Sequence, residues 1–120
     1  MKVLAYVGDT MEFMELENVL ESAQAFVGGY IEVVAITEEI DLVCNDDFLF
    51  QRLEPRVAID MGGLPPVVIC GDCFICRHND MGEFESIREE DMEAINEKVI
   101  HLDTELSKML AILLMVGGEK

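Results

Sequence analysis

The sequence has very little positive charge. Of its 120 residues only eight are Lys or Arg, against 25 Asp or Glu, so the formal net charge is −17. Proteins that bind nucleic acid directly neutralise its phosphates with Lys and Arg, and anionic membrane surfaces attract the same residues. We therefore expect neither direct nucleic-acid binding nor membrane binding. The partner that such a charge suits is a protein with a basic surface, including a surface built to hold DNA or RNA.

Long apolar runs are also missing. The longest, from Met109 to Val116, is far shorter than the roughly 20 residues of a membrane-spanning helix. The first residues, MKVLAYVGDTMEF, become polar early and do not resemble a signal peptide. We therefore expect a cytoplasmic protein. In that compartment its four cysteines stay reduced, so disulfides are not expected.

The apolar residues fall into short segments with two kinds of spacing. β-branched or alternating segments predict strands, and apolar residues three and four positions apart predict helices. The predicted strands are 2–7, 30–36, 42–44 and 48–53 (a hairpin around NDD), 67–76 and a short edge strand near Phe84. The predicted helix covers 11–29 and ends at Gly28 and Gly29, and 54–66 is predicted to be irregular. We expect an α+β core domain over 1–86, with a mostly antiparallel sheet of five or six strands and one packed helix.

The last third of the chain has a heptad pattern. Ser86 and Glu89 form a possible capping box, and apolar residues then fill every a and d position over four heptads. These residues, the predicted dimer interface, are Met92, Ile95, Val99, Leu102, Leu106, Met109, Leu113 and Val116. The pattern predicts a long, coiled-coil-like helix over 87–116, roughly 45 Å in length, that forms a homodimer, with a tail over 117–120. The alternative is an amphipathic helix that lies on its own sheet and breaks near Asp103, which could act as a second N-cap.

Three cysteines, Cys70, Cys73 and Cys76, are spaced as in part of an iron–sulfur loop. Cys44 or His78 could supply a further ligand. The flanking residues are strand formers, however, and a strand would place Cys70 and Cys76 about 20 Å apart, with Cys73 on the opposite face. The favoured interpretation is buried, free cysteines and no cofactor. Metal or iron–sulfur binding through these three residues stays open as an alternative.

Three of the few basic residues, Arg52, Arg56 and Arg77, could converge with Tyr30 to hold a phosphate or a nucleotide. The favoured interpretation is that they pair with local carboxylates. Asp46 and Asp47 could bind a hard cation, or could form a solvated turn. The histidines, at positions 78 and 101, belong to no recognisable catalytic motif, so we do not expect an enzyme.

Four segments in a fixed order carry a family resemblance: QAFVGGYIEVV, LVCNDDF, ICGDCFIC and GEFESI. Together they resemble the family catalogued as domain of unknown function 3846, small proteins common in phages, prophages and plasmids. The resemblance covers about residues 2–95, and its most specific parts are Gly-Gly-Tyr-Ile-Glu and Cys-Asn followed by acidic residues. The sequence departs from the family at LEPRVAI, where an Asn more usually precedes Arg-Ala, and the residues beyond about Glu97 look like an extension.

The resemblance implies an accessory protein of a mobile element and brings no catalytic residues with it. Together with the net charge, it favours a non-catalytic protein that antagonises a host defence or nucleic-acid-handling protein through its acidic surface. A protein that sequesters a small molecule such as a nucleotide signal is the first alternative, and a metal or iron–sulfur protein is the second.

Overall fold

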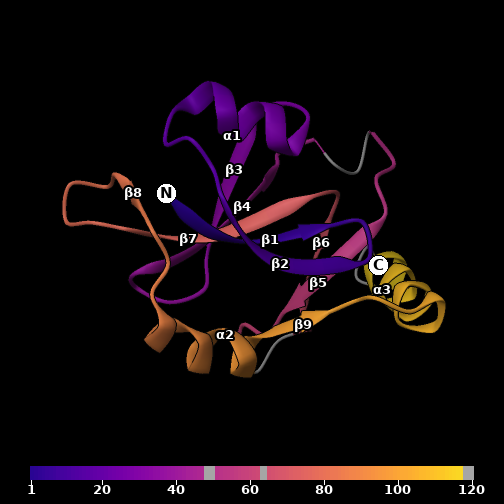
Figure 1. The fold of residues 1–120 in the computed structure, drawn as a ribbon. Helices are drawn as coiled ribbons and strands as arrows, with labels where there is room; N and C mark the ends of the chain where they lie inside the picture. Colours follow the sequence, from indigo (N-terminus) through magenta and orange to yellow (C-terminus); the bar gives the residue numbers. More distant parts are fainter. Residues whose placement is uncertain (48–50, 63–64, 118–120) are drawn as a thin grey trace.

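The computed structural model describes residues 1–47, 51–62 and 65–117 (Figure 1). The elements are β1 (Lys2–Val7), β2 (Thr10–Glu15), α1 (Leu20–Val27), β3 (Ile31–Ala35), β4 (Ile40–Asn45), β5 (Pro55–Ile59), β6 (Val67–Cys70), β7 (Cys73–His78), β8 (Phe84–Glu85), a 3-10 turn (Glu89–Asp91), α2 (Met92–Lys98), β9 (Val99–His101) and α3 (Glu105–Gly117). Within these ranges no helix is both long and apolar enough to cross a membrane.

The strands form two antiparallel sheets. The larger one has the order β2-β1-β7-β4-β3, with β8 also paired to β7, and the smaller one has the order β6-β5-β9. The predicted α+β class, with an antiparallel sheet of five or six strands and a packed helix, is therefore confirmed. The second sheet was not expected.

Strand periodicity places the two sheets and the helices in layers. Along β7, Phe74 and Cys76 face α1, whereas Cys73 and Ile75 face the smaller sheet and α2, because successive side chains point to opposite faces. On the far side of the smaller sheet, Cys70 packs near Ala111 of α3. The order of layers is thus α1, large sheet, small sheet with α2, and α3, as the ribbon also shows (Figure 1).

The predicted continuous helix over 87–116 is wrong. β9 interrupts it and pairs with β5, and the backbone N–H of Leu102 donates to the carbonyl of Arg56 (2.8 Å). The β-branched pair Val99 and Ile100 favours a strand over a helix, and the open edge of β5 offers hydrogen bonds to it. Residues 87–102 therefore pack on the rest of the domain, with Ile87, Ile95 and Leu102 buried.

The break near Asp103, our alternative, is what the structure has. The Thr104 hydroxyl accepts from the N–H of Ser107, and the Ser107 hydroxyl accepts from the N–H of Thr104, both at 3.1 Å. This reciprocal cap starts α3 one residue later than expected. With 13 residues, α3 is about 20 Å long rather than 45 Å.

Three other boundaries differ from the prediction. Met11 to Glu15 is strand β2 rather than helix, because it pairs along its whole length with β1. β5 lies in the segment predicted to be irregular; its proline is the first residue of the strand, where the missing N–H does no harm. Of the second hairpin strand, 48–50 lies outside the described residues and 51–53 is not a strand.

The capping box predicted at Ser86 is not formed. The Ser86 hydroxyl instead accepts from the backbone N–H of Lys2 (2.9 Å). The Asp91 carboxylate accepts from the N–H of Arg88 (2.8 Å), so the turn is capped two residues further along.

The strand predicted over 67–76 is split by Gly71 and Asp72, and its halves lie in different sheets. Gly71 has φ +83°, a conformation that residues with a Cβ rarely adopt. A Cβ placed there would lie 2.6 Å from Cδ1 of Leu53. The change of sheet thus depends on a glycine.

We expect Gly71→Ala to destabilise the fold more than Gly82→Ala. Both glycines have a left-handed φ, but a Cβ at Gly82 would meet nothing within 4 Å. Gly82→Ala should therefore lower the free energy of unfolding by about 1 kcal/mol, from backbone strain alone. Gly71→Ala should lower it by about 2 kcal/mol or more, because the added Cβ also collides with Leu53. Urea denaturation of both variants measures this, and equal losses would contradict it.

Candidate functional site

The cysteines do not form a site. Cys73 and Cys76 lie on opposite faces of β7, and Cys70 lies in the other sheet, so the three thiols belong to three separate parts of the core. Burial raises the pKa of Cys70 to about 11 and the pKa of Cys76 to about 12. Within the described ranges no three His, Cys, Asp or Glu side chains are grouped so that they could hold a metal ion. Buried, protonated thiols fit the favoured interpretation.

The arginines do not converge on Tyr30. Arg77 is buried and pairs with Asp91 and Glu39. Arg56 lies elsewhere, with its Nε 3.2 Å from the Asp72 carboxylate and an Nη 3.4 Å from Glu54. The structure therefore shows the favoured local pairing for Arg56 and Arg77.

Arg52 remains exposed and has φ +54°, which is uncommon for a residue other than glycine. With the other two arginines held by carboxylates, the predicted anion pocket is not assembled.

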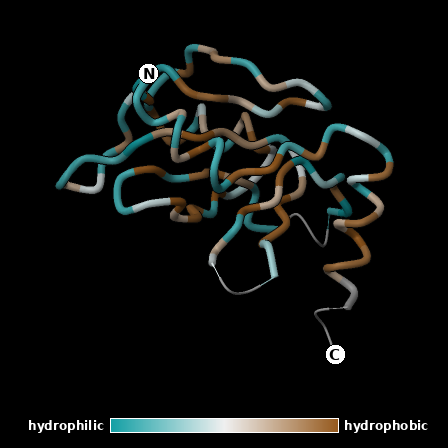
Figure 2. The backbone as a smooth tube through the Cα atoms, turned by 90° about the horizontal axis from the view of Figure 1, so that it is seen from below, coloured by the Kyte–Doolittle hydropathy of each residue, from teal (hydrophilic) through white to brown (hydrophobic). Residues whose placement is uncertain are grey.

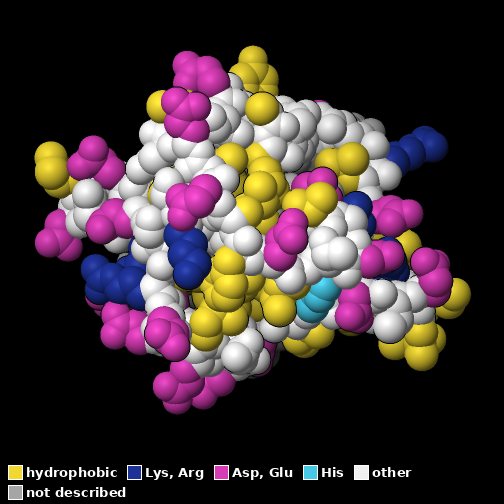
Figure 3. All heavy atoms as spheres, viewed as in Figure 1, with side chains coloured by type: hydrophobic (Ala, Val, Ile, Leu, Met, Phe, Trp, Pro, Cys, Tyr) yellow, Lys and Arg dark blue, Asp and Glu magenta, His cyan; other side chains and the backbone are white. Residues whose placement is uncertain are grey.

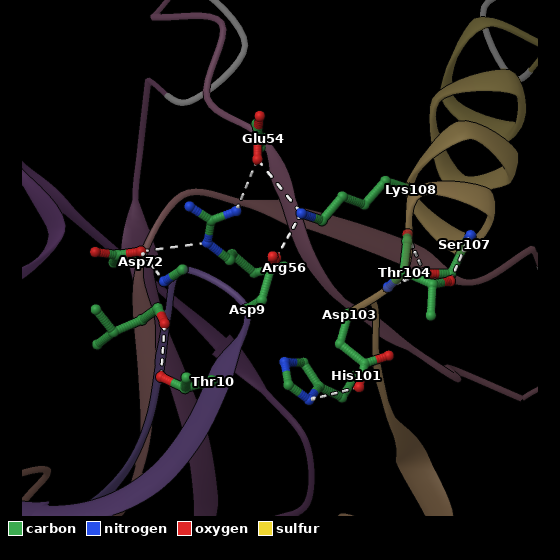
Figure 4. Close-up of polar contacts among 12 residues, drawn as sticks. Asp9, Thr10, Glu54, Arg56, Asp72, His101, Asp103, Thr104, Ser107 and Lys108 are labelled. Carbon is green, nitrogen blue, oxygen red and sulfur yellow. Dashed lines mark hydrogen bonds and ion pairs between the residues drawn. The ribbon is translucent and has the colours of Figure 1, made fainter.

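One cluster of charged residues, the anchor cluster, attaches α3 to the rest of the molecule (Figure 4). The Lys108 ammonium is 2.5 Å from Asp9 in the β1–β2 turn and 3.4 Å from Glu54 at the start of β5. A hydrogen bond from Lys108 lowers the pKa of Asp9. Asp72, which pairs with Arg56, also accepts from the backbone N–H of Gly8 (3.0 Å). Each of these charged side chains is engaged in an ion pair within the cluster, so we assign the cluster a structural role.

His101 lies beside this cluster. Its ring meets the ring of Tyr6 edge-on, with centroids 5.3 Å apart. Its Nε2 is buried and has no hydrogen-bond partner among the described residues.

Helix α3 has an unusual distribution of side chains. Its inward face carries Lys108 and Ala111, which are 7% and 3% exposed. Six large apolar residues, each between 47% and 65% exposed, point to solvent: Leu106, Met109, Leu110, Ile112, Leu113 and Leu114. Apolar colour accordingly runs along α3 where the chain approaches its C-terminus (Figure 2). The helix therefore exposes the face that an amphipathic helix normally buries.

The predicted dimer residues are divided between the core and the surface. Ile95 and Leu102 are buried in their own chain, at 2% and 6% exposed. Met92 and Val99 are half-buried and pack against the same core. Leu106, Met109 and Leu113 are exposed on one face of α3. The side chain of Val116 lies outside the described residues.

A pocket of about 530 Å³ lies beside Tyr30, where α1 ends and β4 leads into its turn. We call it the Tyr30 pocket; its lining consists of Gln24, Gly29, Tyr30, Asp46, Asp47 and Gln51. The segments that meet here are Gly-Gly-Tyr and Asn-Asp-Asp, which also carry the most specific part of the family resemblance. The lining thus contains Tyr30, which was predicted as part of an anion pocket, and Asp46 and Asp47, for which a cation site or a solvated turn was predicted.

The buried side chain of Asn45 holds the Tyr30 pocket together. Its Nδ2 donates to the carbonyl of Val27 (3.0 Å) and to Oε1 of Gln51 (3.3 Å), and its Oδ1 accepts from the N–H of Asp47 (2.7 Å). The N–H of Asp46 donates to the carbonyl of Tyr30 (3.0 Å). The end of α1, the β4 turn and Gln51 are thus fixed by one fully bonded amide. Sequence reasoning missed Asn45, although it lies in the Cys-Asn-acidic segment.

The Tyr30 pocket is negative. Asp46 and Asp47 are exposed, and no basic side chain of the described residues lies within ion-pairing distance of either. The C-terminus of α1, the negative end of its dipole, has no basic residue in its last turn. The pocket is therefore suited to a cation or a hydrogen-bond donor and unsuited to a phosphate.

Residues 1–100 match the model of the family described as domain of unknown function (DUF3846). Because the match covers most of the chain, the chain belongs to this family. It contains the whole Tyr30 pocket, whereas α3 lies beyond it. No curated protein and no solved structure matches the chain.

We expect the four thiols to react very slowly with an aromatic disulfide reagent at pH 8 while the protein is folded. Burial raises their pKa values well above 8, so little reactive thiolate is present. In guanidinium chloride all four should react at once. Absorbance at the wavelength of the released thiolate measures both rates, and fast reaction of the folded protein would contradict the burial of these residues.

Proposed function

We propose that this protein is a non-catalytic binding protein whose acidic surface docks on a basic, nucleic-acid-binding surface of another protein. The proposal rests on which charged side chains the fold exposes and which it buries. Twenty acidic side chains are exposed, whereas Lys2, Arg52 and Arg88 are the exposed basic residues among those described. Acidic side chains are accordingly spread over the face seen in Figure 3, and basic ones are few.

The basic residues are withdrawn from the surface by the fold. Arg77 and Lys108 are buried in ion pairs, and Arg56 and Lys98 are half-buried. The excess of acidic over basic residues is thus proportionally larger among the exposed side chains than in the whole composition. Such a field accelerates association with a basic surface and opposes association with nucleic acid. A protein that occupies the nucleic-acid-binding surface of a host protein would inhibit that host protein. The family resemblance to mobile-element proteins suggests that this host protein acts in defence or in nucleic-acid handling in the cytoplasm.

We further propose that the protein forms a homodimer through α3. The segment from Glu105 to Gly117 contains one acidic and one basic residue, so it is neutral in a chain of net charge −17. A second copy of the chain would be repelled everywhere except at a neutral, apolar surface. Leu106, Met109 and Leu113 are exposed and keep the heptad spacing. An apolar stripe with this spacing can pack against the same stripe of a second copy. A two-fold contact there leaves the acidic surfaces facing outward.

The sequestering of a nucleotide signal, our first alternative, finds less support. A phosphate needs converging cations, and Arg56 and Arg77 are held by carboxylates in separate places. The pocket beside Tyr30 carries two carboxylates, which repel phosphate. The metal alternative is equally weak, because Cys73 and Cys76 lie on opposite faces of β7 and Cys70 lies in the other sheet.

We expect binding to core histones, used as a basic nucleic-acid-binding probe, to weaken steeply with salt. Exposed charge pairs are screened over a Debye length of about 8 Å at physiological ionic strength. The dissociation constant measured by fluorescence anisotropy should therefore rise at least about tenfold between roughly 50 and 200 mM NaCl. An affinity that stays constant over this range would exclude docking through the acidic surface.

We expect the protein to be a dimer in solution and Leu106→Glu/Leu113→Glu to be a monomer, because two buried carboxylates would face their symmetry mates. Leu20→Glu/Met81→Glu is the matched control: it adds the same charge at exposed apolar residues far from α3 and should stay dimeric. Light scattering coupled to gel filtration measures the mass of each. A monomeric native protein, or a control that dissociates equally, would overturn the proposed dimer.

A further inference from the structure

We propose that the Tyr30 pocket binds the guanidinium group of an arginine side chain from the basic partner. The inference rests on the proposed function and names the place where a partner residue docks. In this pocket an aromatic residue, two amides and two carboxylates without an ion-pair partner among the described residues occur together.

The electrostatics of the pocket favour a cation. Asp46 and Asp47 follow each other in the turn after β4, and both are exposed without a basic partner among the described residues. The C-terminal end of α1 adds partial negative charge from carbonyl groups, and its last turn carries no basic side chain. A cation that enters would thus meet three sources of negative potential at one point.

The ring of Tyr30 favours guanidinium over ammonium. Tyr30 belongs to the lining of the pocket and is 75% exposed, so its ring is accessible to a ligand that enters there. Guanidinium is planar, stacks on an aromatic face and donates hydrogen bonds sideways, whereas the ammonium of lysine is a compact, strongly hydrated point charge. A stacked guanidinium can donate to carboxylates in its own plane.

The pocket is held in shape before any ligand arrives. Asn45 fixes Gln51 through its Oε1, which leaves the Nε2 of that amide free of this bond. A Cβ at Gly29 would lie 3.0 Å from Nδ2 of Asn45, so the glycine allows the turn and the helix end to approach closely. Pre-formed geometry reduces the entropy lost on binding. The volume of about 530 Å³ accommodates a long side chain.

The experiment compares two peptides of equal charge, hexa-arginine and hexa-lysine, by fluorescence anisotropy at about 50 mM NaCl. We expect hexa-arginine to bind more tightly. Asp46→Asn/Asp47→Asn should weaken it about tenfold or more, and Tyr30→Ala about threefold or more, with Tyr30→Phe close to the native protein because the aromatic face remains. The amide signals of Tyr30, Asp46, Asp47 and Gln51 should shift most in a titration followed by NMR.

The matched control is Glu12→Gln/Glu17→Gln, which removes two exposed carboxylates outside the pocket and thus makes the same change in net charge. It should weaken hexa-arginine binding less than about threefold. Equal losses in both double variants, or no effect of Tyr30→Ala, would overturn the pocket while leaving docking through the acidic surface intact. If neither peptide binds at low salt, the proposed function itself fails.

Discussion

The structure depends on the burial of both faces of β7. This strand is bonded to β1, β4 and β8 and carries five consecutive buried residues from Cys73 to Arg77. One face meets α1, and the other meets the small sheet and α2. A strand buried on both sides has no room for uncompensated charge. For this reason Arg77 of this strand is paired with Asp91 and Glu39, and His78 is hydrogen-bonded to the buried Asp41.

The same constraint shapes the exterior. Basic residues are few, and the fold uses several of them to neutralise carboxylates at joints between elements, as Lys108 and Arg56 do in the anchor cluster. The charged side chains that stay exposed are nearly all acidic, and the exposed surface of α3 is a neutral exception. Charged and apolar contact surfaces are thereby separated on one small molecule, which is the arrangement expected of a protein that binds itself at one place and a basic partner at another.

Much of the fold could be predicted from local patterns. The strand at 2–7, the αL cap at Gly28 and the edge strand near Phe84 all follow from residue type and spacing. The heptad pattern led to the wrong prediction of one long helix, because apolar residues recur every three or four positions both in a buried helix and in a coiled coil. Only the pairing of Val99–His101 with β5, a long-range contact, decides where that run breaks.

The sites were harder to predict than the fold. Tyr30 was predicted to bind a ligand, but as part of a basic pocket. The sequence shows where the few arginines are, but it does not show which carboxylates pair with them in the fold. Asn45 could not be assigned a role, because its three bonds join α1, its own turn and Gln51. The spacing of the cysteines left a metal site open only as an alternative to buried free thiols. Cys73 and Cys76 lie on opposite faces of β7, and the turn at Gly71 places Cys70 in the other sheet.

The central claim is that this protein and nucleic acid compete for the same basic surface. The most direct measurement is a competition in which the protein is titrated into a complex of core histones with a labelled DNA duplex at constant salt. The account predicts that the protein displaces the DNA completely and that no ternary complex forms. A stable complex containing histones, DNA and this protein together would contradict it.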